Sequence, residues 1–307
     1  MHKDFLTLAN YTPAELQALI DRAVALKAEQ KAGGNPPLLK NKVLGMIFQK
    51  PSLRTRVSFE VGMLQLGGEV LYLSPDEIQL GKRESVPDVA RVLARYVDII
   101  MARVFKHSDV VQLAEWAPIP VINGLSDYSH PCQGLGDFQT IYEHKGRLAG
   151  LKLAFIGDAN NVYNSLLFAA TKLGTHISLA APSGYQPRAD VLELGRGFAA
   201  QSGSRIEIVD DPREAVRNAD AIYTDVWTSM GQEAEREARL RAFQPYQVNE
   251  ALVAQAKPDA IVLHCLPAHR GEEITDGVMD GLHSAVFDQA ENRMHAQKAI
   301  IVTLMKV

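Results

Sequence analysis

The chain has 307 residues, of which 47% are apolar and 22% charged, and its formal net charge is −4. This composition is typical of an ordinary globular protein, and at about 150 residues per domain the length favours two domains. It excludes a strongly basic surface for nucleic acid or an anionic membrane, and no apolar run reaches the roughly 18 residues of a membrane span.

The chain has two cysteines, Cys132 and Cys265, too few for a disulfide framework or a four-cysteine zinc site. The first residues include no apolar signal segment. We therefore expect a cytoplasmic protein that holds no metal.

The first half of the chain alternates expected helices and strands. A helix should begin at Thr12, because Thr12-Pro13-Ala14-Glu15 forms a capping box with proline at the first helical position. It should end near the glycines at 33–34. Further strands are expected at 42–48, 69–73, 98–103 and 119–122, and further helices at 52–66, 85–96, 107–116 and 133–145.

The second half repeats this alternation. Strands are expected at 151–156, 177–180, 205–209, 221–224, 260–265 and 285–287, with helices at 162–173, at about 289–304 and in the remaining gaps. The pattern predicts an α/β protein with two doubly wound parallel-sheet domains. We expect the domains at 1–147, to which a C-terminal helix (289–307) returns, and at 148–288. Ligands bind at the carboxyl ends of such strands, which predicts an active site in the cleft between the domains.

The run Ser52-Leu53-Arg54-Thr55-Arg56 stands where an expected strand ends and a helix begins. Backbone N–H groups at a helix start bind anions, hydroxyl groups can donate to them, and arginine pairs bidentately with phosphate. Arg56 can do the same or pair with a carboxylate. The alternative is an ordinary N-cap serine followed by surface arginines. A Gly-rich P-loop is missing, which argues against a nucleoside triphosphate.

Other polar residues stand at the ends of further expected strands. Arg103 ends one strand, and His130 and Gln133 precede or open a helix. In the second half, Asn160 and Asn161 offer amides at a helix start, although an N-cap pair is the alternative. Asp225 follows a strand and can bind an ammonium group. Cys265, in His264-Cys265-Leu266-Pro267, ends another strand, where an inert buried thiol is the alternative.

These motifs resemble those of the carbamoyltransferases. The pattern Phe-x-Lys-x-Ser-x-Arg-Thr, followed by His-Pro-Cys-Gln, matches that family in order over nearly the whole chain. The resemblance implies that the first run holds the phosphate of carbamoyl phosphate, with Leu53 contributing its backbone. It implies a carbamoyl phosphate-binding set made of Ser52, Leu53, Arg54, Thr55, Gln79, Arg103, His130, Gln133, Cys265, Leu266 and Arg293. Gln79 lies in a loop that, in this family, reaches a neighbouring subunit, which implies a homotrimer or a multiple of trimers.

The second half resembles the ornithine-specific branch of the family. Asp225-Val226-Trp227-Thr228-Ser229-Met230-Gly231 looks like its signature. The resemblance implies that Asn161, Asp225, Ser229 and Met230 bind L-ornithine. The charged segment that begins at Ser229 and runs to about residue 240 is interpreted as a lid, or else as a surface loop.

The resemblance implies carbamoyl transfer from carbamoyl phosphate to the δ-amine of ornithine, giving citrulline and phosphate in arginine metabolism. Cys265, Arg103, His130 and Asp225 are the implied catalytic residues, and no cofactor is required. Transfer to putrescine or N-acetylornithine is the nearest alternative. A nucleotide-dependent oxidoreductase using the Gly157–Asn161 turn and a catalytically silent homologue are more distant ones.

Overall fold

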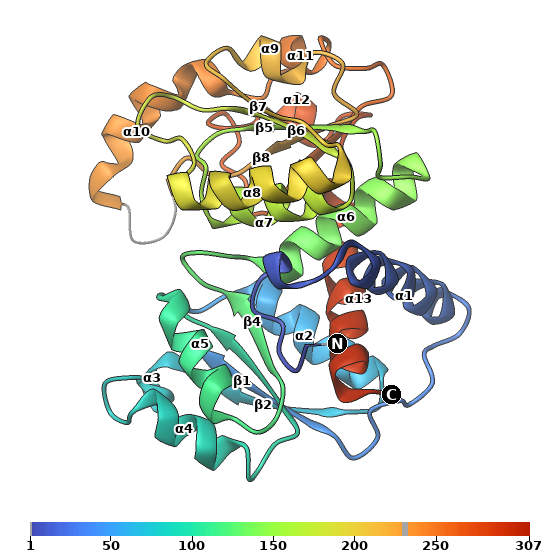
Figure 1. Cartoon of the computed structure of the whole chain (residues 1–307), viewed down its shortest axis with the longest axis vertical. Helices are drawn as coiled ribbons and strands as arrows, with labels where there is room; N and C mark the ends of the chain where they lie inside the picture. Colours follow the sequence, from blue (N-terminus) through green and yellow to red (C-terminus); the bar gives the residue numbers. More distant parts are fainter. Residues whose placement is uncertain (1, 229–232) are drawn as a thin grey trace. The chain divides into compact units, whose positions relative to one another are not determined.

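The computed structural model describes residues 2–228 and 233–307 and contains two compact units (Figure 1). The first comprises the chain up to Gln139 together with Asn292–Val307, and the second is Thr140–Glu291. Two helices, α6 (Pro131–Lys145) and α13 (Val286–Met305), contain the boundaries between the units.

The first unit is built on a four-stranded parallel sheet. Its strands are β1 (Val43–Phe48), β2 (Glu69–Leu73), β3 (Ile99–Arg103) and β4 (Val121–Leu125), in the spatial order β2-β1-β3-β4. The order reverses between β1 and β3, and ligands bind at the carboxyl ends of strands at such a switch point. Ser52 follows β1 and Arg103 ends β3, so the sheet brings these two residues to one edge.

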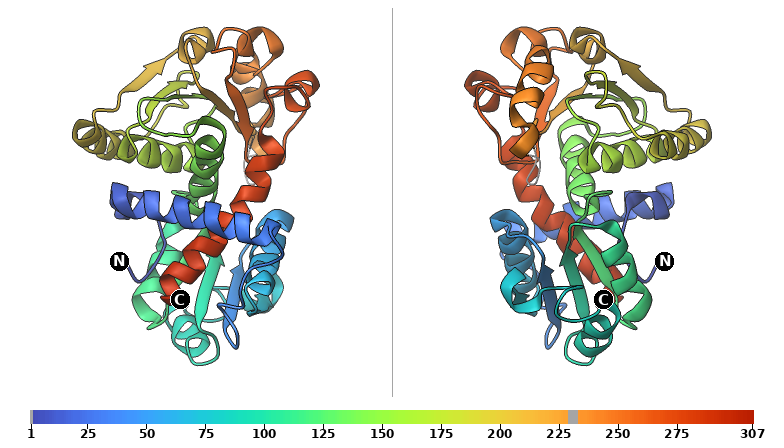
Figure 2. Two further views of the ribbon diagram at one scale, coloured as in Figure 1. Left: turned by 90° about the vertical axis from the view of Figure 1, so that its right-hand side faces the viewer. Right: turned by 90° about the vertical axis from the view of Figure 1, so that its left-hand side faces the viewer.

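Helices cover both faces of this sheet. On one face, α4 (Val86–Leu93) and α5 (His107–Trp116) bury apolar side chains against Ile47, Ile100 and Ala102. On the other lie α2 (Leu53–Gln65) and the last part of α13 (Figure 1). The long helix α1 (Pro13–Lys31) crosses α13 (Figure 2), where Lys27 Nζ donates 2.6 Å to Asn292 Oδ1. The short helices of this unit are η1 (Leu8–Asn10) and α3 (Pro75–Ile78).

The second unit has a five-stranded parallel sheet in the order β7-β6-β5-β8-β9. The strands are β5 (Lys152–Ile156), β6 (His176–Ala180), β7 (Ile206–Val209), β8 (Ala221–Thr224) and β9 (Ile261–His264). Here the switch point lies between β5 and β8. The residues that follow β5, β8 and β9 are therefore placed at the edge where a ligand would bind.

Helices also cover both faces of the second sheet. In Figure 1, α7 (Asn161–Lys172) and α8 (Ala189–Ser202) lie on one face, and α9 (Pro212–Val216) and α11 (Glu250–Val253) on the other. The remaining helices are η2 (Glu233–Glu235), α10 (Arg236–Phe243), η3 (Gln244–Tyr246) and α12 (Asp276–Met279). Within the described residues, no helix is long and apolar enough to span a membrane.

The predicted fold with two parallel α/β sheets is confirmed, as is the capping box at Thr12. The strand predicted at 285–287 is wrong. Ser284 forms one isolated bridge with Val262, and α13 begins at Val286, three residues before the predicted start. The apolar run there suggested a buried strand, but Phe287 is 61% exposed, and Gln289 N–H already donates to Ala285 O in the helical pattern.

Candidate active site

The start of α2 is arranged to bind an anion. Ser52 is its N-cap, and Ser52 Oγ accepts from Thr55 N–H at 3.4 Å and lies 3.0 Å from Thr55 Oγ1. The first turn of a helix has N–H groups without helical partners, and the helix dipole favours a negative charge beside them. Leu53 is 76% exposed, and Arg54 is half-buried. Both are thus accessible to a ligand at this helix start.

Two buried arginines converge on the Thr55 hydroxyl. Arg103 Nη1 donates to Thr55 Oγ1 at 3.2 Å, and Arg293 Nη2 donates to the same oxygen. Arg103 ends β3, whereas Arg293 belongs to α13 and lies 238 residues away from Thr55. Gly136 allows this approach, since a Cβ on Gly136 would lie 3.0 Å from Arg293 Cα. Helix α6 therefore needs a glycine where α13 passes.

His130 lies in this positively charged environment. It is buried, and burial, followed by the charges of Arg293, Arg103 and Lys50, lowers its pKa well below the ordinary value. Its imidazole is therefore neutral at pH 7. Burial and the charge of Arg103 also lower the pKa of Lys50. Lys50, Arg103 and Arg293 thus lie close enough to repel one another, and a bound anion would relieve this repulsion.

We call Ser52, Arg54, Thr55, Arg103, His130 and Arg293 the anion cluster. All six belong to the first unit, and all were predicted from the sequence. Lys50, which the motif contains, was not predicted as a site residue, although its charge acts on His130.

Three further predicted residues have other local partners. Arg56 pairs with Glu60 at 2.9 Å and stacks over Tyr72, so the carboxylate alternative holds for Arg56. Gln133 Nε2 donates 2.7 Å to Asp137 Oδ1. Gln79 is exposed at the end of α3, and its side chain donates to Asp76 O at 3.2 Å.

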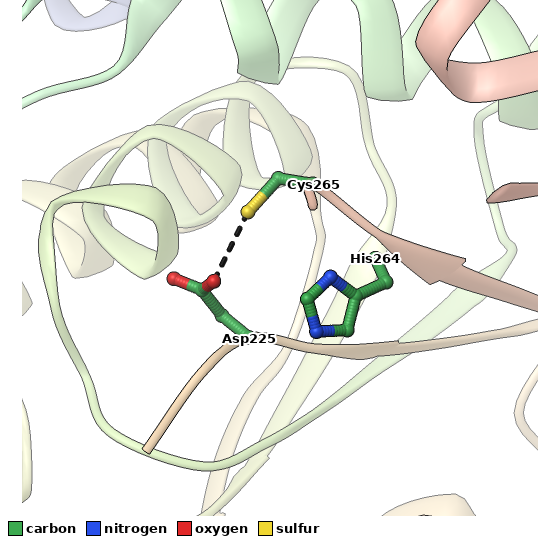
Figure 3. Close-up of side chains that lie close together, drawn as sticks. All are labelled: Asp225, His264 and Cys265. Carbon is green, nitrogen blue, oxygen red and sulfur yellow. Dashed lines mark hydrogen bonds between the residues drawn. The ribbon is translucent and has the colours of Figure 1, made fainter. Parts of the chain in front are cut away.

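In the second unit, the Cys265 thiol donates to Asp225 Oδ1 at 3.1 Å (Figure 3). The two residues directly follow β9 and β8, which are adjacent strands in register from Ala221–Ile261 to Thr224–His264. The parallel pairing thus places the thiol beside the carboxylate. Asp225 is buried, whereas Cys265 remains partly accessible.

Asn160 is the second partner of Asp225 and was not predicted as a binding residue. Its Nδ2 donates 2.8 Å to Asp225 Oδ2, while its Oδ1 caps α7 by accepting from Val162 N–H and Tyr163 N–H. Asn160 is therefore the N-cap of α7, as the alternative interpretation had it, and its side-chain N–H group is used by Asp225. Asn161, the predicted residue, is the first residue of α7.

His264 is oriented by two neighbours. Its Nδ1 accepts from Leu266 N–H at 2.9 Å, so Nε2 carries the proton shared with Glu273 Oε1 at 3.0 Å. His264 and Glu273 are both fully enclosed. The N–H of Leu266, a predicted residue, thus fixes the ring beside Cys265.

A buried ion pair lies beside the same strand ends. Arg239 Nη1 donates 2.8 Å to Asp158 Oδ2 and 3.0 Å to Trp227 O. Burial raises the pKa of Asp158, Arg239 opposes that rise, and the nearby Asp225 adds to it. Arg239 is therefore the counter-charge in a region that contains the buried Asp225 carboxylate and the partly buried Asp158 carboxylate.

We call Asp225, Cys265 and Asn160 the thiol cluster. Ligand atoms of Asp225, His264 and Cys265 lie within 4.8 Å of one another, but both ring nitrogens of His264 already have partners. Such a set suits the binding of an amine better than that of a metal ion. The predicted residues Ser229 and Met230 lie outside the described residues.

Several of these contacts are not indicated by sequence. Asn160 was adjacent to the predicted Asn161 and carried the same signal. Glu273 and Arg239 are separated from their partners by 9 and 81 residues, and no local pattern links them. Only the folded chain brings them together.

The anion cluster, whose arginines carry positive charge, lies at the carboxyl ends of one parallel sheet, and the thiol–carboxylate pair lies at those of the other. This arrangement is that of a two-domain α/β enzyme of the group-transferring class. Two family models match the chain: the carbamoyl-P binding domain of aspartate/ornithine carbamoyltransferase at residues 3–143, and the Asp/Orn binding domain at residues 149–304. The chain belongs to the aspartate/ornithine carbamoyltransferase family.

Individual relatives are similar along their whole length. An ornithine carbamoyltransferase of Anoxybacillus flavithermus is 56% identical over 99% of this chain and 96% of its own. The structure of ornithine carbamoyltransferase from Pyrococcus furiosus superposes with a TM-score of 0.95 at 55% identity, covering 97% of this chain and 96% of that one. The enzyme from Thermus thermophilus gives a TM-score of 0.90 at 46% identity, covering 99% of each chain.

Proposed function

We propose that this protein transfers the carbamoyl group of carbamoyl phosphate to the δ-amine of L-ornithine, giving L-citrulline and phosphate. The observation that carries the proposal is the convergence of Arg103 and Arg293 on Thr55 at the start of α2. Such an arrangement suits a phosphate dianion. The names of the relatives, ornithine carbamoyltransferases, support the choice of acceptor.

The anion cluster holds the leaving group and the developing charge. Ser52, Arg54 and the N–H groups at Leu53 and Thr55 bind the phosphate. Arg103, the neutral His130 and the Thr55 hydroxyl donate to the carbamoyl oxygen, which becomes an oxyanion when the amine attacks. Gln133, Gln79 and Arg293 complete the donor-binding set, together with Cys265 and Leu266 of the second unit.

The thiol cluster prepares the nucleophile. An alkyl amine is mostly protonated at pH 7, because its pKa is about 10.4 in the lysine reference. Asp225 attracts the amine, and the Asp225–Cys265 pair accepts its proton. The amine nitrogen then bonds to the carbamoyl carbon, and the bond from that carbon to the phosphate oxygen breaks. Phosphate leaves with the electron pair and takes up the second proton that the amine nitrogen loses. Asn161, Ser229 and Met230 bind the amino-acid end of ornithine.

A citrulline assay with three amines tests the acceptor. Ornithine should support turnover, whereas putrescine and N-acetylornithine should react far more slowly. A preference for either alternative amine would overturn the substrate assignment. A protein that binds carbamoyl phosphate without any turnover would support the silent homologue instead.

We assign carbamoyl phosphate binding to a domain at 1–147, with helix 289–307 returning to it, and ornithine binding to a domain at 148–288. The two family models support this division, since they match residues 3–143 and 149–304 and name the same two ligands.

We further propose a homotrimer in which Gln79 serves the carbamoyl phosphate of a neighbouring subunit. The exposed apolar side chains of α2 support an interface there: Leu53 is 76%, Val57 45% and Leu64 65% exposed. Apolar patches on a surface often mark contacts between subunits. Gln79→Ala subunits should bind carbamoyl phosphate weakly, and Cys265→Ala subunits should be inactive. Mixing the two should then restore activity at low carbamoyl phosphate, because some sites receive both native residues. No recovery after reassembly would argue against the shared site.

A biosynthetic role in the cytoplasm is the final part of the proposal. A Pyrococcus furiosus relative, 54% identical over 99% of this chain, is named an anabolic ornithine carbamoyltransferase. The two free cysteines suit a reducing compartment. Expression of this protein should restore growth without arginine in a strain that lacks ornithine carbamoyltransferase activity. If the expressed protein is active but growth is not restored, a catabolic role would be favoured.

A further inference from the structure

Gln49, the residue after β1, connects three parts of the first unit. Its side-chain Oε1 accepts from Phe105 N–H at 2.7 Å. Its Nε2 donates to Asp109 Oδ2 at 3.1 Å and to Leu80 O at 3.4 Å. Its backbone N–H donates to Arg103 O at 2.9 Å. One amide thus joins the ends of β1 and β3, the first turn of α5 and the loop after α3.

Leu80 is the point at which that loop is held. Its side chain is 5% exposed and packs in the apolar cluster with Ile47, Val86 and Val89. The residue before it, Gln79, has φ 39° and ψ 48°, a left-handed conformation that non-glycine residues keep only when their surroundings impose it. The contacts of Leu80 therefore restrain where Gln79 can point.

Only an amide satisfies the partners of Gln49. Phe105 N–H requires an acceptor, while Leu80 O and the Asp109 carboxylate require a donor. A glutamate has nearly the same shape but would place a second carboxylate against Asp109 and leave Leu80 O without its donor. The amide orientation is consequently fixed by its neighbours.

We infer that Gln49 is a positioning residue for carbamoyl phosphate, which acts by holding the Leu80 carbonyl and through it the Gln79 loop. The inference rests on the proposed function, since it assumes that Gln79 contacts the donor substrate. Because Gln49 directly precedes Lys50 and follows β1, it also ties this loop to the strand ends that carry the anion cluster of the same subunit.

A double-mutant cycle tests this role. Gln49→Met should raise the KM for carbamoyl phosphate about tenfold, the equivalent of one hydrogen-bonded restraint, with little change in kcat or in the KM for ornithine. Gln79→Ala should raise the same KM. In the Gln79→Ala background, Gln49→Met should have almost no further effect, because residues that act through one another are not additive.

The controls separate the possible failures. Gln49→Glu provides a second variant should the methionine variant fold poorly, and exposed Gln201 on α8, changed to Met or Glu, controls for the side-chain change alone. Full additivity of Gln49→Met with Gln79→Ala would overturn the inference, as would a native KM in either Gln49 variant. Native protein that fails to make citrulline would instead overturn the proposed function.

Discussion

The thiol of Cys265 lies 3.1 Å from Oδ1 of Asp225, at the ends of two adjacent parallel strands. The other carboxylate oxygen accepts from Asn160, and the Asp225 Oδ1 also accepts from Val226 N–H. Both oxygens are therefore engaged before a substrate arrives. An incoming amine must displace or share one of these donors, and the thiol is the donor that can itself lose a proton.

Replacing the thiol by a hydroxyl tests the part that Cys265 takes, together with Asp225, in accepting the proton of the amine. Cys265→Ser can still donate to Asp225, but a serine hydroxyl is a much poorer acid than a thiol. We expect kcat to fall by about 10²- to 10⁴-fold, the usual contribution of general acid–base catalysis, while inorganic phosphate binds normally. Citrulline formation and calorimetric binding measure the two effects. Buried Cys132, changed to serine, is the control, and native turnover by Cys265→Ser would remove the role.

The Thr55 hydroxyl should matter for the donor substrate. Thr55→Val removes the acceptor shared by Arg103 and Arg293 while keeping the side-chain volume. Two buried guanidinium groups then lose an oriented contact worth roughly 1–3 kcal/mol, so the KM for carbamoyl phosphate should rise about ten- to a hundredfold. Thr55→Ser should restore most of the affinity. Thr303→Val on α13 is the matched control, and an unchanged KM in Thr55→Val would contradict the prediction.

The histidine of the anion cluster should make stability depend on pH. Burial and the neighbouring cations lower the pKa of His130 in the folded chain, whereas the unfolded value is about 6.5. Between these values the unfolded chain binds more protons, so stability is full above about pH 6.5 and falls as the pH drops, by at most about 1.4 kcal/mol per pH unit.

Urea unfolding across this range measures that effect. His130→Gln should show a shallower loss of stability below about pH 6.5 than the native chain. Exposed His2, changed to Gln, should leave the slope unchanged. Parallel pH profiles for the native chain and His130→Gln would mean that His130 does not titrate abnormally.

The buried arginine on α10 should stabilise the second unit. Arg239→Met leaves the partly buried Asp158 without its counter-charge and removes the donor to Trp227 O. Removing one partner of a buried ion pair lowers the free energy of unfolding by about 3–5 kcal/mol. Because Asp158 is partly exposed, we expect a loss at or below the lower end of that range. Chemical denaturation compares it with Arg241→Met, an exposed change on the same helix. Equal stability of the two variants would show that the pair contributes little.

Local signals in the sequence predicted the local parts of the structure. The capping box at Thr12 and the N-cap at Ser52 depend on residues within three positions, and both are confirmed. The parallel sheets followed from the alternation of apolar strands and helices. At 285–287 the same reasoning failed, because a short apolar run fits a strand and the start of a helix equally well.

The site required more than local pattern. The anion cluster was predicted through its motifs, yet the convergence of Arg103 and Arg293 on one hydroxyl depends on how α13 packs. No periodicity or spacing in the sequence predicts that His264 pairs with Glu273 or that Asp158 pairs with Arg239. Such contacts are set by the tertiary structure. In the sequence each partner is a residue type that is common on protein surfaces, so its identity does not indicate the pairing.

The anion cluster depends on Gly136, although this residue is not one that we expect to contact a ligand. A methyl group there would meet the backbone of Arg293 at 3.0–3.2 Å, and neither helix backbone can yield as a flexible side chain would. A Gly136→Ala chain would have to move the backbone of α6 or α13 by a few tenths of an ångström, which would alter the contact between Arg293 and Thr55. Measured kinetically, such a change would be indistinguishable from damage to a substrate-binding arginine. Variation at this position is therefore best judged by affinity for the donor substrate, not by its apparently conservative chemistry.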